Sequence, residues 1–195
     1  MLKKILSVLL LTVIIFTLTL SLSSCKPSKY YVKLEVRDYG DIILELDRKN
    51  TPITVDNFVS LVESGFYDGL TFHRVIDGFV IQGGDPNANG TGGSDKKIKG
   101  EFSANGHNNK IKHTRGVISM ARGETYDSAS SQFFIMHDAA PHLDGKYAAF
   151  GYVIEGMDVV DAIVENTGLY GDYLAYFKQY QAVIEKATVL DNYKK

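Results

Sequence analysis

Cysteine is almost absent from this chain of 195 residues, since Cys25 is the only one. A disulfide within the chain is therefore excluded. A basic excess is absent too: the formal net charge is -2, whereas nucleic-acid-binding domains usually carry a strongly basic surface. We accordingly expect no nucleic-acid partner. The sequence has no internal repeat and no low-complexity tract, and 45% of its residues are hydrophobic. These properties fit one compact domain together with a targeting segment.

The sequence also lacks the usual patterns of metal binding and nucleophilic catalysis. Its histidines have no HxxxH-type spacing and no cysteine partners, and no Gly-x-Ser-x-Gly motif is present. Ser131, His137 and Asp138 would form a triad only in a geometry that a sequence cannot show. The glycine-rich residues 90–93 are followed by no Lys-Ser or Lys-Thr pair, so they predict a turn. We expect no metal and no cofactor.

The N-terminus has the three parts of a secretory signal. Lys3 and Lys4 form a basic start, residues 5–20 are mainly apolar, and Leu-Ser-Ser-Cys closes the stretch at residues 22–25. This ending resembles a bacterial lipobox, in which small residues precede a cysteine that becomes lipidated. The alternative is an uncleaved transmembrane anchor, because the apolar stretch is nearly long enough to span a membrane.

The lipobox predicts how the chain is divided. Residues 1–24 are expected to be a lipoprotein signal peptide, and residues 25–29 a lipidated Cys25 with a short polar tether. Residues 30–195 then form the folded domain. We expect this domain to be extracytoplasmic and anchored to the bacterial cell membrane by the lipid on Cys25.

Hydrophobic periodicity predicts many short strands and two helices. Residues 31–36 and 41–46 alternate apolar and polar side chains around a turn, as in an antiparallel hairpin. A helix is expected from Thr54, as its N-cap, to Gly65, and a second helix over residues 157–164. Further apolar runs cover residues 70–75, 79–82, 117–121, 132–136, 148–154 and 183–189. This pattern favours an antiparallel barrel or sandwich with helices at its open ends.

Three separated motifs carry a family resemblance. They are FHRVIDGFVIQGGD at residues 72–85, SQFFI at residues 131–135 and HLDGK at residues 142–146. In this order they resemble the cyclophilins, which are peptidyl-prolyl cis-trans isomerases. The likeness runs from residue 30 to the C-terminus and is poor over residues 168–181. It implies a mainly β fold, a closed eight-stranded antiparallel barrel capped by two α-helices, with the substrate groove on its outer surface.

The resemblance also implies the site residues. Arg74, Phe79 and Gln82 match the catalytic set, in which the guanidinium stabilises a twisted amide and the apolar ring contacts proline. The implied partners are proline-containing polypeptides. The matching substrate-binding residues are His73, Val80, Ala121, Arg122, Phe134, His142, Leu143 and Tyr147.

Four of these positions depart from the residue that is common in the family. Val80 stands for methionine, Arg122 for asparagine, His142 for tryptophan and Tyr147 for histidine. Since that tryptophan supports tight binding of cyclosporin-type peptides, we expect cyclosporin binding to be possible but weak.

Two alternatives remain open at this point. The same groove would serve a non-catalytic chaperone that holds proline-containing segments, although such a module needs the apolar pocket and not Arg74. The tyrosine-rich residues 168–181 form either a turn packed on the barrel or a surface for partners.

Overall fold

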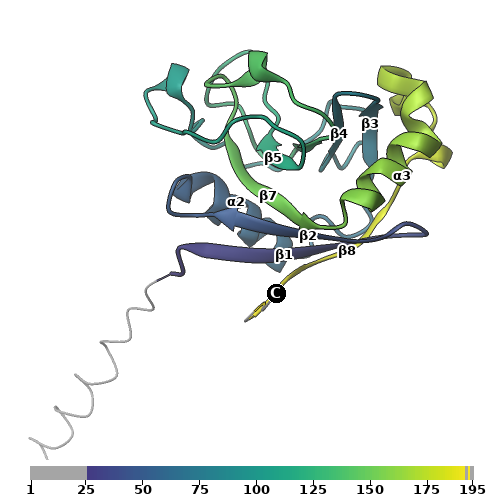
Figure 1. The fold of residues 1–195 in the computed structure, drawn as a ribbon, viewed down its shortest axis with the longest axis horizontal. Coiled ribbons are helices and arrows are strands. Elements are labelled where there is room, and N and C mark those ends of the chain that lie inside the picture. The colour runs from purple at the N-terminus through teal and green to yellow at the C-terminus, as the bar shows by residue number, and fades with distance from the viewer. Residues whose placement is uncertain (1–25, 192, 194–195) are drawn as a thin grey trace, which may run out of the picture.

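The computed structural model describes residues 26–191 and residue 193. Most of this part of the chain consists of eight strands, two α-helices and four short 3₁₀ helices, arranged as in Figure 1. The strands are β1 (Lys29–Val36), β2 (Gly40–Asp47), β3 (Phe72–Ile76), β4 (Val80–Gly83), β5 (Val117–Met120), β6 (Phe133–Met136), β7 (Ala149–Glu155) and β8 (Ile184–Val189). The helices are α2 (Pro52–Glu63), α3 (Met157–Thr167), η1 (Ser103–Asn105), η2 (Pro141–Leu143), η3 (Gly168–Tyr176) and η4 (Lys178–Tyr180).

The predicted signal peptide, residues 1–24, and the predicted lipidation site Cys25 lie outside the described residues. Within the described residues, the helices are all too short or too polar to span a lipid bilayer.

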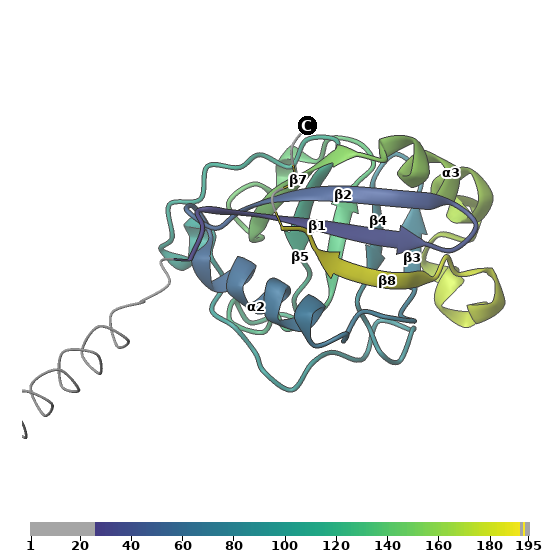
Figure 2. The ribbon, with the colours of Figure 1, turned by 90° about the horizontal axis from the view of Figure 1, so that it is seen from below.

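The strands form one antiparallel sheet in the order β3-β4-β6-β5-β7-β2-β1-β8. The sheet curls, so that β1, β2 and β8 lie across from β3 and β4 (Figures 1 and 2). Its two edges meet beside the starts of β3 and β8. Thr71 and Val183 form a β-bridge there, and the backbone N–H of Phe72 donates a hydrogen bond to the carbonyl of Ala182. Eight antiparallel strands are confirmed, but full closure is not shown. The edge pairing is confined to this short stretch, and the sheet is a curled half-barrel.

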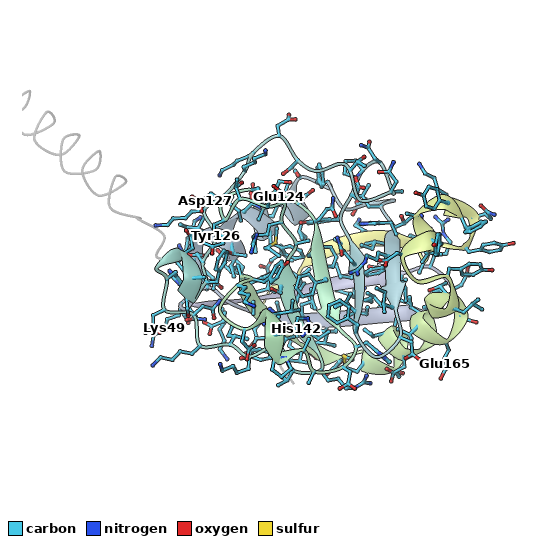
Figure 3. The ribbon with its side chains drawn as sticks, turned by 90° about the horizontal axis from the view of Figure 1, so that it is seen from above. Lys49, Glu124, Tyr126, Asp127, His142 and Glu165 are labelled. Carbon is cyan, nitrogen blue, oxygen red and sulfur yellow. The ribbon has the colours of Figure 1, made fainter. Side chains whose placement is uncertain are left out.

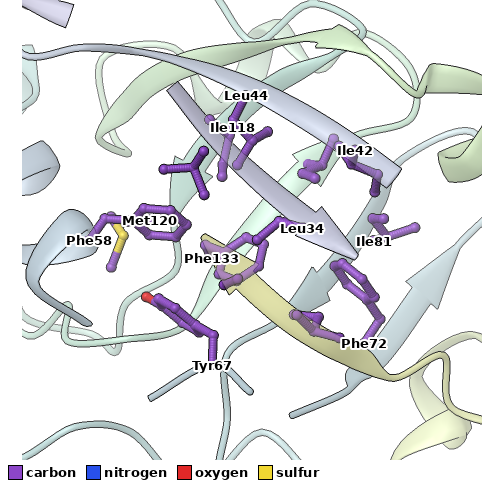
Figure 4. Close-up of a cluster of buried hydrophobic side chains, with 14 of the residues drawn as sticks. Leu34, Ile42, Leu44, Phe58, Tyr67, Phe72, Ile81, Ile118, Met120 and Phe133 are labelled. Carbon is purple, nitrogen blue, oxygen red and sulfur yellow. The ribbon is translucent and has the colours of Figure 1, made fainter. Parts of the chain in front are cut away.

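The inside of the curled sheet is filled by apolar side chains. Alternate residues of β1 and β2 point inward, as the alternation of the sequence predicts. Phe58 of α2 joins them, with its ring centroid 5.4 Å from that of Phe133 and 5.2 Å from that of Phe150. Figure 4 shows this cluster, which includes Leu34, Ile42, Leu44, Phe72, Ile81 and Ile118. A filled interior requires a ligand site to lie on the outer face.

Helix α2 begins earlier than its sequence pattern predicts. The expected N-cap, Thr54, lies inside the helix, and Thr51 is the cap residue. The buried carboxylate of Glu101 accepts hydrogen bonds from the backbone N–H groups of Ile53 and Thr54 at 3.1 and 2.8 Å. This distant acceptor satisfies the free N–H groups that a side-chain cap would otherwise bind. The helix ends at Glu63 with Ser64 as its C-cap, and Gly65 follows with a φ of +71° that suits glycine.

Helix α3 covers the other end of the sheet and contacts β2 and β3. Its expected inward residues Val159, Val160 and Ile163 are all buried, and the helix continues three residues beyond the predicted end to Thr167. The expected apolar runs at residues 70–75 through 183–189 each overlap a strand. The sequence periodicity therefore located the regular elements well.

The tyrosine-rich residues 168–181 fold into η3 and η4 and pack beside α3 and β3. Leu174 is completely buried, which agrees with the interpretation of a turn packed on the barrel. Tyr173 and Tyr176 remain 71% and 80% exposed, so the segment also presents aromatic rings to solvent. Figure 2 shows it at the end of the molecule opposite the start of β1.

Candidate active site

Strand alternation separates two adjacent phenylalanines. Phe133 packs in the interior, whereas Phe134 belongs to a second apolar cluster on the outer face of the sheet. Val80 of β4 and Leu143 of η2 lie in the same outer cluster. The outer face of β4, β6, β5 and β7 therefore carries an apolar floor of its own.

A pocket of about 380 Å³ opens over this floor. Of the eleven site residues inferred from the sequence, ten line it and His73 does not. His142 lies on the face that Figure 3 shows, between the loop that carries Tyr126 and the helix that carries Glu165. The lining residues are Arg74, Phe79, Val80, Gln82, Ala121, Arg122, Phe134, His142, Leu143 and Tyr147.

Arg74 projects from the outer face of β3 with 30% of its side chain exposed. Its Nη1 donates a long hydrogen bond of 3.4 Å to Oε1 of Gln82, and its Nε donates to Oδ1 of Asp172 at 2.5 Å. The guanidinium carbon lies 5.7 Å from the centroid of the Phe79 ring. These contacts hold a permanent positive charge at the edge of an apolar pocket.

Gln82 connects Arg74 to the loop beside the pocket. Its Nε2 donates to Oε1 of Gln132 at 2.9 Å, and Nε2 of Gln132 donates in turn to the carbonyls of Gly90 and Gly92 at 3.1 and 2.7 Å. The orientation of the Gln82 amide is thereby determined by its neighbours. Gln132 is absent from the site residues inferred from the sequence, although the SQFFI motif contains it.

Aromatic side chains form the floor and walls of the pocket. Phe134 is 5% exposed, and Tyr147 contacts it edge to face at a centroid distance of 5.9 Å. The imidazole of His142 stacks on Phe79 at 5.8 Å. Leu143 closes the floor with 8% of its surface exposed. A ring without hydrogen-bond donors, such as pyrrolidine, suits this lining.

Arg122 forms a wall of the pocket and not a free cation. Its guanidinium lies 4.7 Å from the ring centroid of Tyr147 and 5.2 Å from that of Tyr126. It also donates to the carbonyl of Lys146 through Nε and Nη2, at 3.2 and 3.1 Å. These contacts leave Arg74 as the guanidinium whose position at the pocket edge suits a substrate amide.

Comparison with known proteins identifies the family of this chain. The family model of cyclophilin type peptidyl-prolyl cis-trans isomerase/CLD matches residues 31–189. A Helicobacter pylori peptidyl-prolyl cis-trans isomerase is 49% identical over 129 residues, which cover 65% of this chain and 76% of that protein. Peptidyl-prolyl cis-trans isomerase B of Bacillus subtilis is 47% identical over 123 residues, covering 63% and 82%. This chain belongs to the cyclophilin family.

A solved structure shows the same fold. The cyclophilin type peptidyl-prolyl cis-trans isomerase of Cryptosporidium parvum superposes with a TM-score of 0.72 at 29% sequence identity. The match covers 85% of this chain and 99% of that one. The likeness in structure therefore extends over nearly the whole cyclophilin domain.

His73 needs a correction as a substrate-binding residue. It precedes Arg74 on β3 at a β-bulge, where the register shifts between Phe72 and Arg74, and only 1% of the residue is exposed. Burial lowers the pKa of His73 because it disfavours the imidazolium form, although the nearby Asp85 carboxylate acts in the opposite direction. In this cyclophilin His73 is buried close to Gly90 and does not line the pocket.

A second buried histidine supports the pocket floor. His113 stacks on Phe134 at 6.0 Å, and its Nδ1 and Nε2 lie 3.1 Å from Asp144 Oδ1 and from Ser119 Oγ. Burial lowers the pKa of His113, against the opposing effect of Asp144. Ser119 is fully buried, so this series of residues holds the Phe134 ring and presents no nucleophile to a substrate.

The imagined triad of Ser131, His137 and Asp138 is not formed. The hydroxyl of Ser131 donates to the carbonyl of Gly84 at 2.8 Å. Nδ1 of His137 accepts a hydrogen bond from the backbone N–H of Gly78 at 3.0 Å. The two side chains therefore serve separate structural contacts.

The two buried histidines predict a loss of stability in mild acid. The ordinary histidine pKa is 6.5, and burial lowers it for His73 and His113 in the folded state. Below pH 6.5 the unfolded chain therefore takes up protons that the folded chain does not, and the free energy of unfolding falls as pH falls. For two histidines, the free energy of unfolding changes by at most about 2.7 kcal/mol per pH unit.

Urea denaturation of the domain between pH 7.5 and 5.0 measures this slope. His113→Gln removes one of the two groups, so its stability should depend less steeply on pH over the same range. A stability that stayed constant or rose on acidification would contradict the expectation.

Proposed function

We infer that this chain catalyses cis–trans isomerisation of X-Pro peptide bonds. The observation that carries the inference is the gathering of Arg74, Gln82 and the apolar rings of Phe79 and Phe134 around one pocket. Family membership supports the same activity, since the Helicobacter pylori and Bacillus subtilis relatives are named peptidyl-prolyl cis-trans isomerases. The substrates are proline-containing polypeptides.

The reaction needs no bond cleavage. Its barrier of about 18–20 kcal/mol arises from amide resonance, which is lost as the peptide twists. The prolyl nitrogen then regains its lone pair and becomes a better hydrogen-bond acceptor. A guanidinium fixed at the pocket edge donates to this nitrogen or to a neighbouring carbonyl, and the contact is strongest in the twisted state. Arg74 supplies this donor.

The apolar floor holds the proline ring while the adjacent peptide rotates. Phe134, Leu143 and Phe79 surround the ring, and the Gln82 amide binds the peptide backbone beside it. The pocket binds the proline ring and leaves the preceding residue free. Rotation about the X-Pro bond therefore moves the preceding part of the chain while the ring stays in place. In this geometry the apolar floor binds the proline ring, and the charged donor Arg74 stabilises the twisted amide.

A non-catalytic chaperone that binds proline-containing segments is the second candidate. Such a module requires the apolar floor but gains little from an oriented guanidinium. The contacts of Arg74 with Gln82 and Phe79 at the edge of the pocket therefore favour the enzyme.

Arg74→Ala should separate the two candidates. Loss of one charge-assisted donor in a partly dry site costs about 3–4 kcal/mol, so kcat/KM should fall roughly 10²–10³-fold. Affinity for a proline peptide should change much less, because the apolar floor remains. Arg74→Lys should not restore full activity, since an ammonium lacks the planar fork.

A protease-coupled isomerase assay and calorimetric titration measure the two quantities. Arg37→Ala, which removes an arginine that is 54% exposed after β1, is the control for charge. Near-native turnover of Arg74→Ala would make Arg74 a bystander and favour the chaperone.

We also propose that cyclosporin binds this cyclophilin weakly. His142 lines the pocket and stacks on Phe79, where an indole would cover more apolar surface. His142→Trp should tighten cyclosporin binding by about 1–3 kcal/mol, as expected of an aromatic anchor. Fluorescence titration of both forms tests this, and equal dissociation constants would refute it.

We further propose an extracytoplasmic location, with a lipid anchor on Cys25. The basic start, apolar stretch and LSSC ending of residues 1–25 support it. Since β1 begins at Lys29, four residues after Cys25, an anchored domain would work close to the membrane surface.

Cys25→Ala should abolish labelling by a fatty-acid analogue and leave an unprocessed precursor. Ser24→Ala keeps a small residue before the cysteine, so it should be lipidated normally and serves as the matched control. Labelling with an alkynyl fatty acid and membrane fractionation follow the outcome. Normal processing and release of Cys25→Ala would rule the anchor out.

A further inference from the structure

Residues 168–181 bring a carboxylate to the edge of the pocket. Asp172 of η3 accepts a hydrogen bond from Nε of Arg74 at 2.5 Å, although the two residues are 98 positions apart in the sequence. The Asp172 side chain is 70% exposed and that of Arg74 is 30% exposed. This contact is a charge-assisted hydrogen bond at the rim of the site.

The backbone of the segment is held firmly at this place. Leu174 is completely buried in the core, two residues after Asp172. Gln181 accepts a hydrogen bond from the Thr71 hydroxyl at 2.5 Å and donates to the carbonyl of Leu174 at 3.0 Å. These contacts attach the segment to the chain next to β3, the strand that carries Arg74.

Gly171 gives the turn that presents Asp172. Its φ of +52° and ψ of -128° lie in a region that residues with a side chain rarely adopt. A Cβ at this position would meet no atom within 4 Å, so the backbone conformation and not space requires glycine. Glycine adopts this conformation readily, so the turn that brings Asp172 to Arg74 depends on glycine at position 171.

We propose that Asp172 is a positioning residue for Arg74 in the isomerase reaction, a role that rests on the proposed function. The two hydrogen bonds of Arg74 engage Nε and Nη1, so Nη2 stays available for the substrate. The bond to Gln82 is long, at 3.4 Å, and by itself restrains a flexible arginine poorly. Asp172 supplies the second fixed point that sets the plane of the guanidinium.

Asp172→Ala should lower kcat about two- to fivefold, the range that a solvent-exposed ion pair supports. The dissociation constant of a proline peptide should stay unchanged, because Asp172 does not line the pocket floor. Asp172→Asn keeps an oxygen that accepts from Nε, so its kcat should stay close to that of the native protein. The Arg74 Nε–H signal in ¹⁵N NMR should be protected from exchange in the native protein and in Asp172→Asn, and lost in Asp172→Ala.

Gly171→Ala tests the same idea without changing any charge. The strained backbone should displace Asp172 and lower kcat as Asp172→Ala does. Glu165→Gln, which removes an exposed carboxylate from the neighbouring α3, is the charge control and should keep the native kcat.

The outcomes separate this inference from the proposed function. If Arg74→Ala is impaired while Asp172→Ala is native in kcat and in the NMR signal, the positioning role is overturned and the isomerase stands. Faster turnover of Asp172→Ala would also overturn it, because Asp172 would then restrain Arg74 from its substrate. If Asp172→Asn and Asp172→Ala lowered kcat equally, the hydrogen bond from Arg74 Nε would not be the basis of the positioning role. If the native protein shows no isomerase activity, the proposed function itself has failed.

Discussion

The alternation of side chains across a filled, curled sheet governs the rest of this structure. Each strand sends one residue to the interior and the next to the outer face. Phe133 fills the core while Phe134 forms the floor of the outer pocket. Because the interior has no room for a ligand, chemistry is confined to the outer face.

Neighbouring strands then bring distant parts of the chain together. β4 lies between β3 and β6 in the sheet, so Gln82 stands between Arg74 and Gln132 and hydrogen-bonds to both. The site thus rests on paired strands, whose backbone hydrogen bonds hold its parts more rigidly than loops would. His113 and its partners support the floor from below, which adds a polar network beneath an apolar surface.

The two arginines of the pocket show how surroundings decide a role. Arg122 is enclosed by aromatic rings and bound to backbone carbonyls, and it serves as a wall. Arg74 is restrained by a long bond to Gln82 and by Asp172, while it remains close to the open pocket. The same chemical group therefore packs against aromatic rings in Arg122 and provides an available positive charge in Arg74.

Local patterns and motifs in the sequence specify the regular elements and most of the site. Alternating and helical patterns located the strands and helices, because these periods depend on neighbouring residues. The family resemblance named the ten residues that line the pocket. Features that depend on pairing between distant segments emerge in the folded structure. It limited the pairing of the two sheet edges to a short stretch at Thr71 and Val183, and it buried His73. It also placed Glu101 on the start of α2 and Asp172 on Arg74. These contacts join residues far apart in the chain, and no local pattern records them.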